Sequence, residues 1–175
     1  MVEELASLVS WHGQGKTDVR WSDIEHRLNL RLPNDYKMYV ERFPVGQFQT
    51  YLRIIHPGAS PDDSDVFVAM KNIIAEFELD IEEGLAPRFP YLFHPHTGGL
   101  LPWGYVGFDW VMTWATSPTL LPNNWPTVII SSDLDEWFEF NGPMTRCISA
   151  IVTGDDRLEA LRYISERPPI FHAFS

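Results

Sequence analysis

The sequence predicts a single α+β domain in which helices pack on an antiparallel β-sheet. Apolar residues recur at helical spacing in roughly the first 45 residues, β-type runs follow between residues 110 and 141, and helical spacing returns after residue 144. Strands that follow one another without intervening helices favour antiparallel pairing. The 175 residues fit one domain, and they contain no repeat, low-complexity segment or internal linker.

Three short helices are expected first. One ends before the polar segment 13–20, and the second begins near Ser22, a good N-cap residue, with Glu25 as its capping-box partner. The third extends from Asn34 to Phe43. Their buried faces are expected to contain Val2, Leu5, Leu8 and Val9, then Trp21, Ile24 and Leu28, then Tyr36, Tyr39, Val40 and Phe43.

A strand and a long helix are expected next. The segment Gln49–Ile55 is rich in aromatic and β-branched residues, which predicts the first strand, and a polar loop containing Pro61 follows. From Val66 to Glu83, apolar residues recur at three- and four-residue steps while acids occupy the other face. This pattern predicts an amphipathic helix, which Gly84 ends.

The stretch 85–107 is crowded with proline and glycine, and three short strands are expected after it. Turns at 117–124 and 132–135 are expected to join them in antiparallel order. The predicted strands are Trp110–Thr116, Thr127–Ser131 and Trp137–Asn141.

Two helices are expected near the end of the chain. Gly154 ends the first, Met144–Val152, because glycine readily adopts the left-handed conformation of a helix C-terminus. The aspartate pair 155–156 can cap a last helix that extends toward Ile164. The proline pair 168–169 breaks this helix and leaves a short tail.

The charge excludes several classes of partner. The chain has 24 Asp and Glu against 13 Lys and Arg, a net charge of -11, whereas affinity for nucleic acid comes mainly from Lys and Arg. No apolar run approaches the ~20 residues of a membrane span, and the first residues carry acids where a secretory signal has bases. The single cysteine, Cys147, suits a reducing compartment. We therefore expect a cytoplasmic protein that binds neither nucleic acid nor membranes.

The excess negative charge is confined to two stretches. Between Asp62 and Glu83 there are eight acids and one base, and from Asp133 to Glu139 there are four acids and no base. The second group could hold a hard cation, but the residue order and glycine of an EF-hand are absent. A solvated acidic face is therefore favoured, with Glu139 on the opposite face of its strand from Phe138 and Phe140.

No motif indicates catalysis. The segment Gly13–Thr17 resembles the end of a P-loop but lacks its first glycine and preceding strand, which favours an interhelical loop. His94 and His96 lack further metal ligands at a recognisable spacing. Cys147 lies among apolar helical residues and is expected to be a buried packing thiol. We expect a non-enzymatic protein with no metal and no cofactor.

Five of the seven tryptophans lie in the strand-rich part of the chain. Most should be buried, because each ring removes a large apolar area from water. Trp110 and Trp125 lie next to loops and are the candidates for exposed interface anchors.

Several motifs follow one another in a distinctive order. Trp21 and the pair Ile24 and Glu25 lead into the sequence LPNDYK at 32–37, and YLRIIHP follows at 51–57. Later come GGLLPWG, Trp114, Trp125, WFEF and a helix that ends in Thr153 and Gly154. Over residues 20–155, this order resembles the SUKH superfamily in its Smi-Knr form.

The resemblance implies one SUKH-like domain over residues 1–175, with helices packed on an antiparallel sheet. Many bacterial members are immunity proteins that bind and block a cognate polymorphic toxin, and others are fungal cell-wall regulators that act through protein contacts. The resemblance implies no active-site residues, in agreement with the absence of catalytic motifs.

We therefore expect a binding protein that neutralises a cognate toxin, often a nuclease or a deaminase in such systems. An acidic face attracts a basic toxin surface at long range. The alternative is a regulatory or scaffold module of the Smi-Knr type, which binds a cellular protein or a small ligand in an aromatic pocket between sheet and helices. The candidate contacts for the toxin are Asp133, Asp135, Glu136, Glu139, Glu76, Asp80, Glu83, Trp110 and Trp125.

Overall fold

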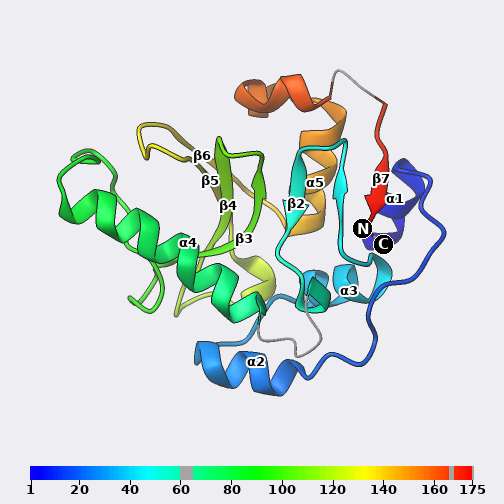
Figure 1. Ribbon diagram of the computed structural model, residues 1–175, viewed down its shortest axis with the longest axis horizontal. Helices are drawn as coiled ribbons and strands as arrows, with labels where there is room; N and C mark the ends of the chain where they lie inside the picture. Colours follow the sequence, from blue (N-terminus) through cyan, green and yellow to red (C-terminus); the bar gives the residue numbers. More distant parts are fainter. Residues whose placement is uncertain (60–64, 166–167, 175) are drawn as a thin grey trace.

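The computed structural model describes residues 1–59, 65–165 and 168–174, and seven strands in this part of the chain form one sheet (Figure 1). The strands are β1 (Gly46–Phe48), β2 (Leu52–Ile54), β3 (Leu100–Val106), β4 (Trp110–Ala115), β5 (Thr127–Ser131), β6 (Trp137–Phe140) and β7 (Phe171–Ala173). The helices are α1 (Val2–Leu8), α2 (Trp21–Leu28), α3 (Asn34–Arg42), α4 (Asp65–Glu82) and α5 (Met144–Thr153), with the 3-10 helices η1 (Pro57–Ala59), η2 (Pro122–Asn124) and η3 (Asp156–Ile164).

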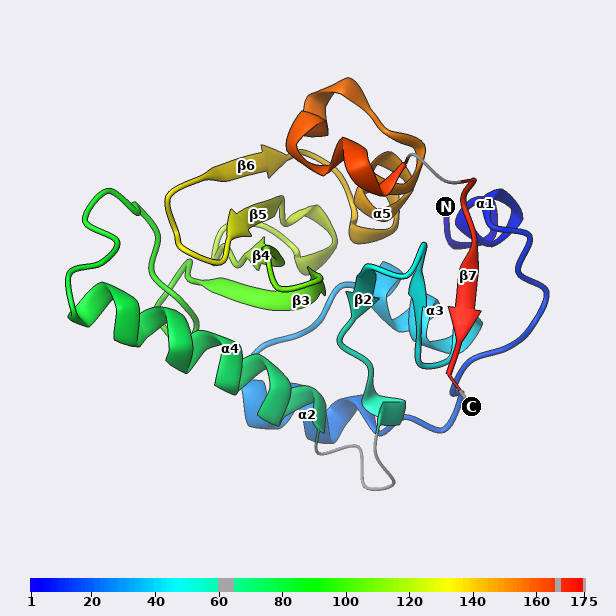
Figure 2. The ribbon, with the colours of Figure 1, turned by 45° about the horizontal axis from the view of Figure 1, so that its top comes forward.

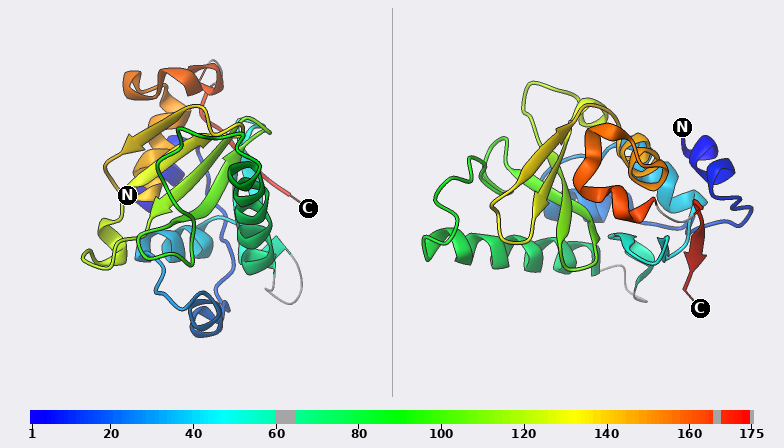
Figure 3. Two further views of the ribbon diagram at one scale, coloured as in Figure 1. Left: turned by 90° about the vertical axis from the view of Figure 1, so that its left-hand side faces the viewer. Right: turned by 90° about the horizontal axis from the view of Figure 1, so that it is seen from above.

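The sheet separates two groups of helices. Its strand order is β6-β5-β4-β3-β2-β1-β7, and each pair of neighbours is antiparallel. Helix α4 lies on one side of the strands and α5 lies on the other (Figure 3). Helices α1 and α3 pack against α5. This architecture confirms the predicted α+β class and the antiparallel sheet.

The strongest patterns of the sequence are confirmed. The three consecutive strands form β4, β5 and β6, and the amphipathic segment forms α4. Gly154 ends α5 with a φ of 74°, in the left-handed region that glycine adopts readily. Leu8 is the exception among the helical residues expected to be buried, since it is exposed, and Trp21 is only partly buried. The loop predicted around Pro61 lies outside the described residues.

The capping box predicted for the second helix is wrong. Helix α2 begins at Trp21 and has no side-chain cap, so Ser22 lies inside its first turn. Glu25 has a different role, because its Oε1 accepts a hydrogen bond from the backbone N–H of Leu32 at 2.8 Å and lies 2.6 Å from Lys37 Nζ. Glu25 thereby links α2 to α3 across the intervening turn.

The strand predicted over Gln49–Ile55 is confirmed only for Leu52–Ile54, because the chain reverses over the first residues of the segment. Gln49 and Thr50 have φ values of 49° and 73°, and they form the turn between β1 and β2. Two consecutive positive φ values are typical of the two-residue turn that matches the twist of a hairpin. The first residues of this segment therefore form the turn, and only Leu52–Ile54 form a strand, β2.

Three strands, β1, β3 and β7, had no counterpart in the prediction. Strand β3 contains Pro102 and Gly104, and its register shifts between these two residues, which is where a sheet tolerates proline. It is buried along nearly its whole length, so it shows no polar alternation. The tail expected after the proline pair 168–169 instead forms β7, which pairs with β1 at the sheet edge.

The LPNDYK motif forms a buried junction between α3, α5 and the sheet. Asp35 Oδ2 accepts a hydrogen bond at 3.1 Å from the backbone N–H of Thr145, in the first turn of α5. Burial raises the pKa of this carboxyl group above its ordinary value. Tyr36 is fully buried, its hydroxyl donates to the carbonyl oxygen of Ile55 at 2.6 Å, and its ring packs edge-on against Trp114. These residues position the first helices on the sheet.

Candidate protein interface

The C-terminal part of the first acidic stretch lies at the same end of the molecule as the second stretch. Asp80 and Glu82 lie in the last turn of α4, and Glu83 follows it. The turn between β5 and β6 lies close by, with the loop 84–99 between them (Figure 2). Within residues 79–92 and 132–140 there are seven carboxylates and one basic side chain, Arg88. We call these two segments the acidic end.

The predicted acidic residues of α4 share one flank of the helix. Glu76, Asp80 and Glu83 follow steps of four and three residues, which place side chains in one row. Glu76 and Glu83 are exposed and Asp80 is half-buried, with Glu76 farthest from the helix end. Asp62 and Asp63, which contributed to the predicted charge, lie outside the described residues.

Asp133 shapes the β5–β6 turn from within. Its Oδ1 accepts hydrogen bonds from Ser131 Oγ at 2.6 Å and from the backbone N–H of Asp135 at 3.2 Å. The Ser131 hydroxyl stabilises the ionised carboxylate, so the pKa of Asp133 lies below its ordinary value. Leu134 is buried with a φ of 57°, which turns the chain sharply. Asp135 and Glu136 are consequently exposed on a fixed turn.

The loop after α4 contacts the acidic residues of the hairpin directly. Arg88 Nη2 lies 3.6 Å from Asp135 Oδ1, and both side chains are largely exposed, so this ion pair contributes little stability. The Tyr91 hydroxyl donates to Glu139 Oε1 at 2.7 Å. Partial burial, followed by the Glu139 carboxylate, raises the pKa of the phenol to about 12. These contacts attach the loop to β6.

A row of aromatic rings connects α4, the loop after it and β6 at the acidic end. Phe77 of α4 stacks on Phe93 at 5.3 Å between ring centres, and Phe93 stacks on Phe89 at 5.8 Å. Phe89 then meets the Trp137 ring of β6 edge-on, again at 5.8 Å. Such offset and edge-on pairs each contribute about 0.5–1.5 kcal/mol beyond their buried area. The row fixes the end of α4 relative to the β5–β6 hairpin.

Apolar side chains are exposed beside these carboxylates. Leu79, Leu85 and Leu92 have exposed fractions of 53%, 62% and 59%, and Trp137 is half-buried. Protein interfaces combine apolar anchors with a polar rim, and the acidic end has both. The leucines could not be identified from the sequence, because their spacing there did not distinguish exposed residues from buried ones.

The prediction that Trp110 or Trp125 is exposed is wrong. Their exposed fractions are 9% and 6%. Trp110 packs against Phe138 of β6 with 5.3 Å between ring centres, and the indole N–H of Trp125 donates to the carbonyl oxygen of Ser117 at 3.2 Å. Trp110 is thus covered by a neighbouring strand and Trp125 is bound to the β4–β5 connection, so proximity to a loop did not mean contact with water.

The other candidate motifs have structural roles or lie apart. The backbone N–H groups of Gly15 and Lys16 donate to the carbonyl oxygens of Glu41 and Val40, so these amides are already used and do not form a phosphate cradle. Cys147 is buried, as expected, and burial raises the pKa of its thiol. Among the described residues, no three His, Cys, Asp or Glu side chains are grouped so that they could hold a metal ion.

Comparison of the chain with protein-family models, with curated proteins and with solved structures finds no match. Within residues 1–59, 65–165 and 168–174, none of the helices has the length and apolar character needed to cross a membrane.

Proposed function

We propose that this protein is an immunity protein of the SUKH superfamily, which neutralises a cognate toxin by binding a basic surface with its acidic end. The observation that carries the proposal is the combination at this end of seven carboxylates, one basic side chain and the exposed leucines 79, 85 and 92. Negative charge alone suits many roles, but negative charge around exposed apolar anchors is typical of a surface that binds a basic protein.

The physical chemistry of the acidic end favours rapid and specific association. Asp80, Glu82, Glu83 and Glu136 form no ion pair with another described residue, so their field extends into solvent. Such a field attracts a basic partner at long range and raises the association rate. The leucines supply the apolar contact that slows dissociation. A nuclease or deaminase bound in this way would lose access to its nucleic acid.

The positions of the family-like motifs support the same proposal. Tyr36 and Trp114 meet inside the core, and Trp103 packs against Trp114 with 6.2 Å between ring centres. Asp35 accepts a hydrogen bond from the start of α5. The motifs that resemble the SUKH superfamily are therefore mainly framework residues. The surface that would select a toxin lies outside them, as expected for a scaffold whose members bind different partners.

The proposal is tested with the toxin domain encoded beside this gene. Asp135, Glu136 and Glu83 are replaced by lysine together, while Asp133 is kept because it forms the turn. The triple variant should bind the purified toxin domain at least about tenfold more weakly, with slower association and a smaller salt dependence. It should also fail to protect cells that express the toxin. The matched control, E41K/D156K/E159K, changes three exposed acids elsewhere and alters net charge equally.

A second pair of variants tests the apolar anchors. Leu85→Ala and Leu92→Ala should each weaken the complex by about fivefold or more, mainly through faster dissociation. The control is Leu121→Ala, which truncates a leucine that is 72% exposed in the β4–β5 connection, at the opposite end of β5 from the β5–β6 turn. Equal affinity for the wild type and the acidic triple variant, or equal losses in E41K/D156K/E159K, would refute the assignment of this surface.

A further inference from the structure

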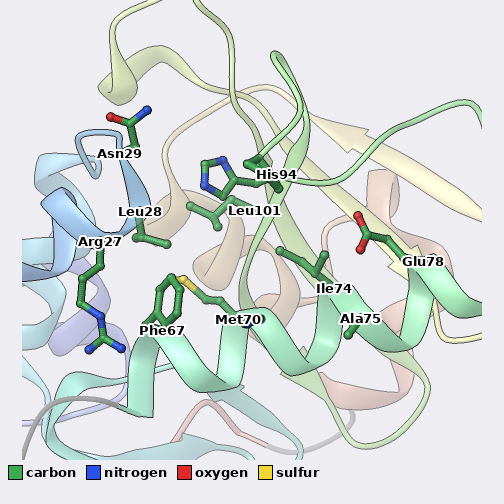
Figure 4. Close-up of a pocket in the computed structure, with 12 residues that line it drawn as sticks. Arg27, Leu28, Asn29, Phe67, Met70, Ile74, Ala75, Glu78, His94 and Leu101 are labelled. Atoms are coloured by element: carbon green, nitrogen blue, oxygen red, sulfur yellow. The ribbon is translucent and has the colours of Figure 1, made fainter.

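A pocket of about 350 Å³ lies between α2, α4 and the first residues of β3, separate from the leucines of the acidic end (Figure 4). Met70 and Ile74 point from α4 toward Leu28 and Leu101, and Phe67 closes one end (Figure 4). The lining is mainly apolar, with a few polar groups at the rim. This volume falls within the range of about 300–1,000 Å³ that is usual for small-molecule sites.

The pocket is lined by two basic side chains and one acidic side chain. Arg27 and Lys71 both line the pocket, and neither forms an ion pair with a described residue. On α4, Lys71 lies four residues after Phe67, between Phe67 and Glu78. The Arg27 guanidinium lies over the Phe67 ring, 4.5 Å from its centre, which holds the cation at the mouth of the pocket. Glu78 is seven residues beyond Lys71 on α4, about 10 Å along the helix. A positive and a negative end therefore flank an apolar floor.

His94 adds a polar group without adding charge. Its ring lies beside Leu101 and faces the pocket (Figure 4), and it hydrogen-bonds to the backbone of Leu28. Burial lowers the pKa of its imidazole, which favours the uncharged form. The attraction for an anion therefore comes from Arg27 and Lys71.

We propose that this pocket binds a small amphipathic carboxylate, with its apolar body on Met70, Ile74 and Leu101 and its carboxylate between Arg27 and Lys71. The apolar floor accepts a chain or a ring but offers no buried partner for a second charge. Glu78 repels an anion from the opposite end, which fixes the direction in which the ligand lies. The site is independent of the acidic end, so it adds a ligand to the proposed function without depending on it.

Decanoate, below its micellar concentration, is the probe. Titration of protein labelled at the methionine ε-methyl groups should shift the Met70 signal saturably, and calorimetry should give one site per chain. Decanol, which has the same chain length without the charge, should bind at least threefold more weakly. Arg27→Gln and Lys71→Gln should each weaken decanoate binding roughly threefold to tenfold, and Glu78→Gln should strengthen it. Arg146→Gln removes an exposed cation from α5, outside the pocket, and should leave the affinity unchanged.

The outcomes separate this site from the acidic end. The triple variant D135K/E136K/E83K should bind decanoate with nearly wild-type affinity even if its toxin binding is lost. An unsaturable or absent Met70 shift would overturn the proposal. So would equal binding of decanol and decanoate, or equal affinities in wild type and the Lys71→Gln variant. None of the four substitutions removes a buried apolar group, so the variants are expected to fold.

Discussion

Asp35 connects two helices that are distant in sequence, and its replacement by alanine tests how the core is held together. Helix α5 follows Pro143 and has no side-chain cap of its own, and Asp35 of α3 supplies the acceptor for the N–H of Thr145. Loss of a helix cap costs about 0.5–2 kcal/mol. A buried N–H left without an acceptor costs about 1–3 kcal/mol.

The expected loss is smaller than the sum of these two costs, because the alanine variant no longer buries a carboxylate. We expect Asp35→Ala to lower the free energy of unfolding by about 2 kcal/mol, which corresponds to a decrease in Tm of about 4–8 °C for a chain of this size. Urea unfolding followed by tryptophan fluorescence measures the change, with an unchanged slope against urea as the sign of two-state behaviour. A loss below about 0.5 kcal/mol would refute the reasoning, since even a surface cap contributes that much.

The pH dependence of Asp35 gives a second test with a definite sign. The pKa of Asp35 is 3.8 in the unfolded chain, and burial raises it in the folded protein. At any pH between the unfolded pKa and the folded pKa, the folded state therefore binds more protons than the unfolded state. The stabilisation from this group is complete below pH 3.8 and is lost as the pH rises through the folded pKa. Asp35→Asn keeps an acceptor oxygen without titrating. The wild type should therefore lose stability relative to this variant as the pH rises, and the opposite slope would show that burial does not dominate.

Three further predictions concern single groups. Tyr36→Phe removes the buried bond to Ile55 and should lower the free energy of unfolding by about 1–2 kcal/mol; an unchanged urea midpoint would contradict this. Cys147 should react with Ellman's reagent only after unfolding, because burial covers the thiol and raises its pKa, and rapid reaction of the native protein would show that it is accessible. Glu139→Gln should lower the pKa of Tyr91 from about 12 toward 10.0 in a spectrophotometric titration, whereas an unmoved pKa would exclude the Glu139 carboxylate as a cause.

Exposure along a strand could be predicted from the sequence, whereas the exposure of the apolar residues beside the carboxylates could not. Glu139 is exposed and Phe140 is buried because alternation along a strand is a local property. The exposure of Leu85 and Leu92 depends on how the loop after α4 folds over the aromatic row, which is a property of the whole domain. The burial of Trp110 and Trp125 could not be predicted for the same reason. Phe138 of β6 packs on Trp110, and the carbonyl oxygen of Ser117 accepts a hydrogen bond from the Trp125 indole.

The sequence by itself determined the elements whose apolar residues follow a regular period: α4, α5 and the strands β4 to β6. It also determined the confinement of the negative charge to two stretches, because charge and periodicity are properties of consecutive residues. Only the tertiary structure decided that β3 is a central strand despite Pro102 and Gly104, and that the C-terminal tail completes the sheet as β7. The tertiary structure alone brought the C-terminal part of the first acidic stretch close to the second stretch, and it placed Arg27 and Lys71 around a shared pocket. Long-range packing fixes these arrangements, because the contacts that stabilise them join residues far apart in the chain.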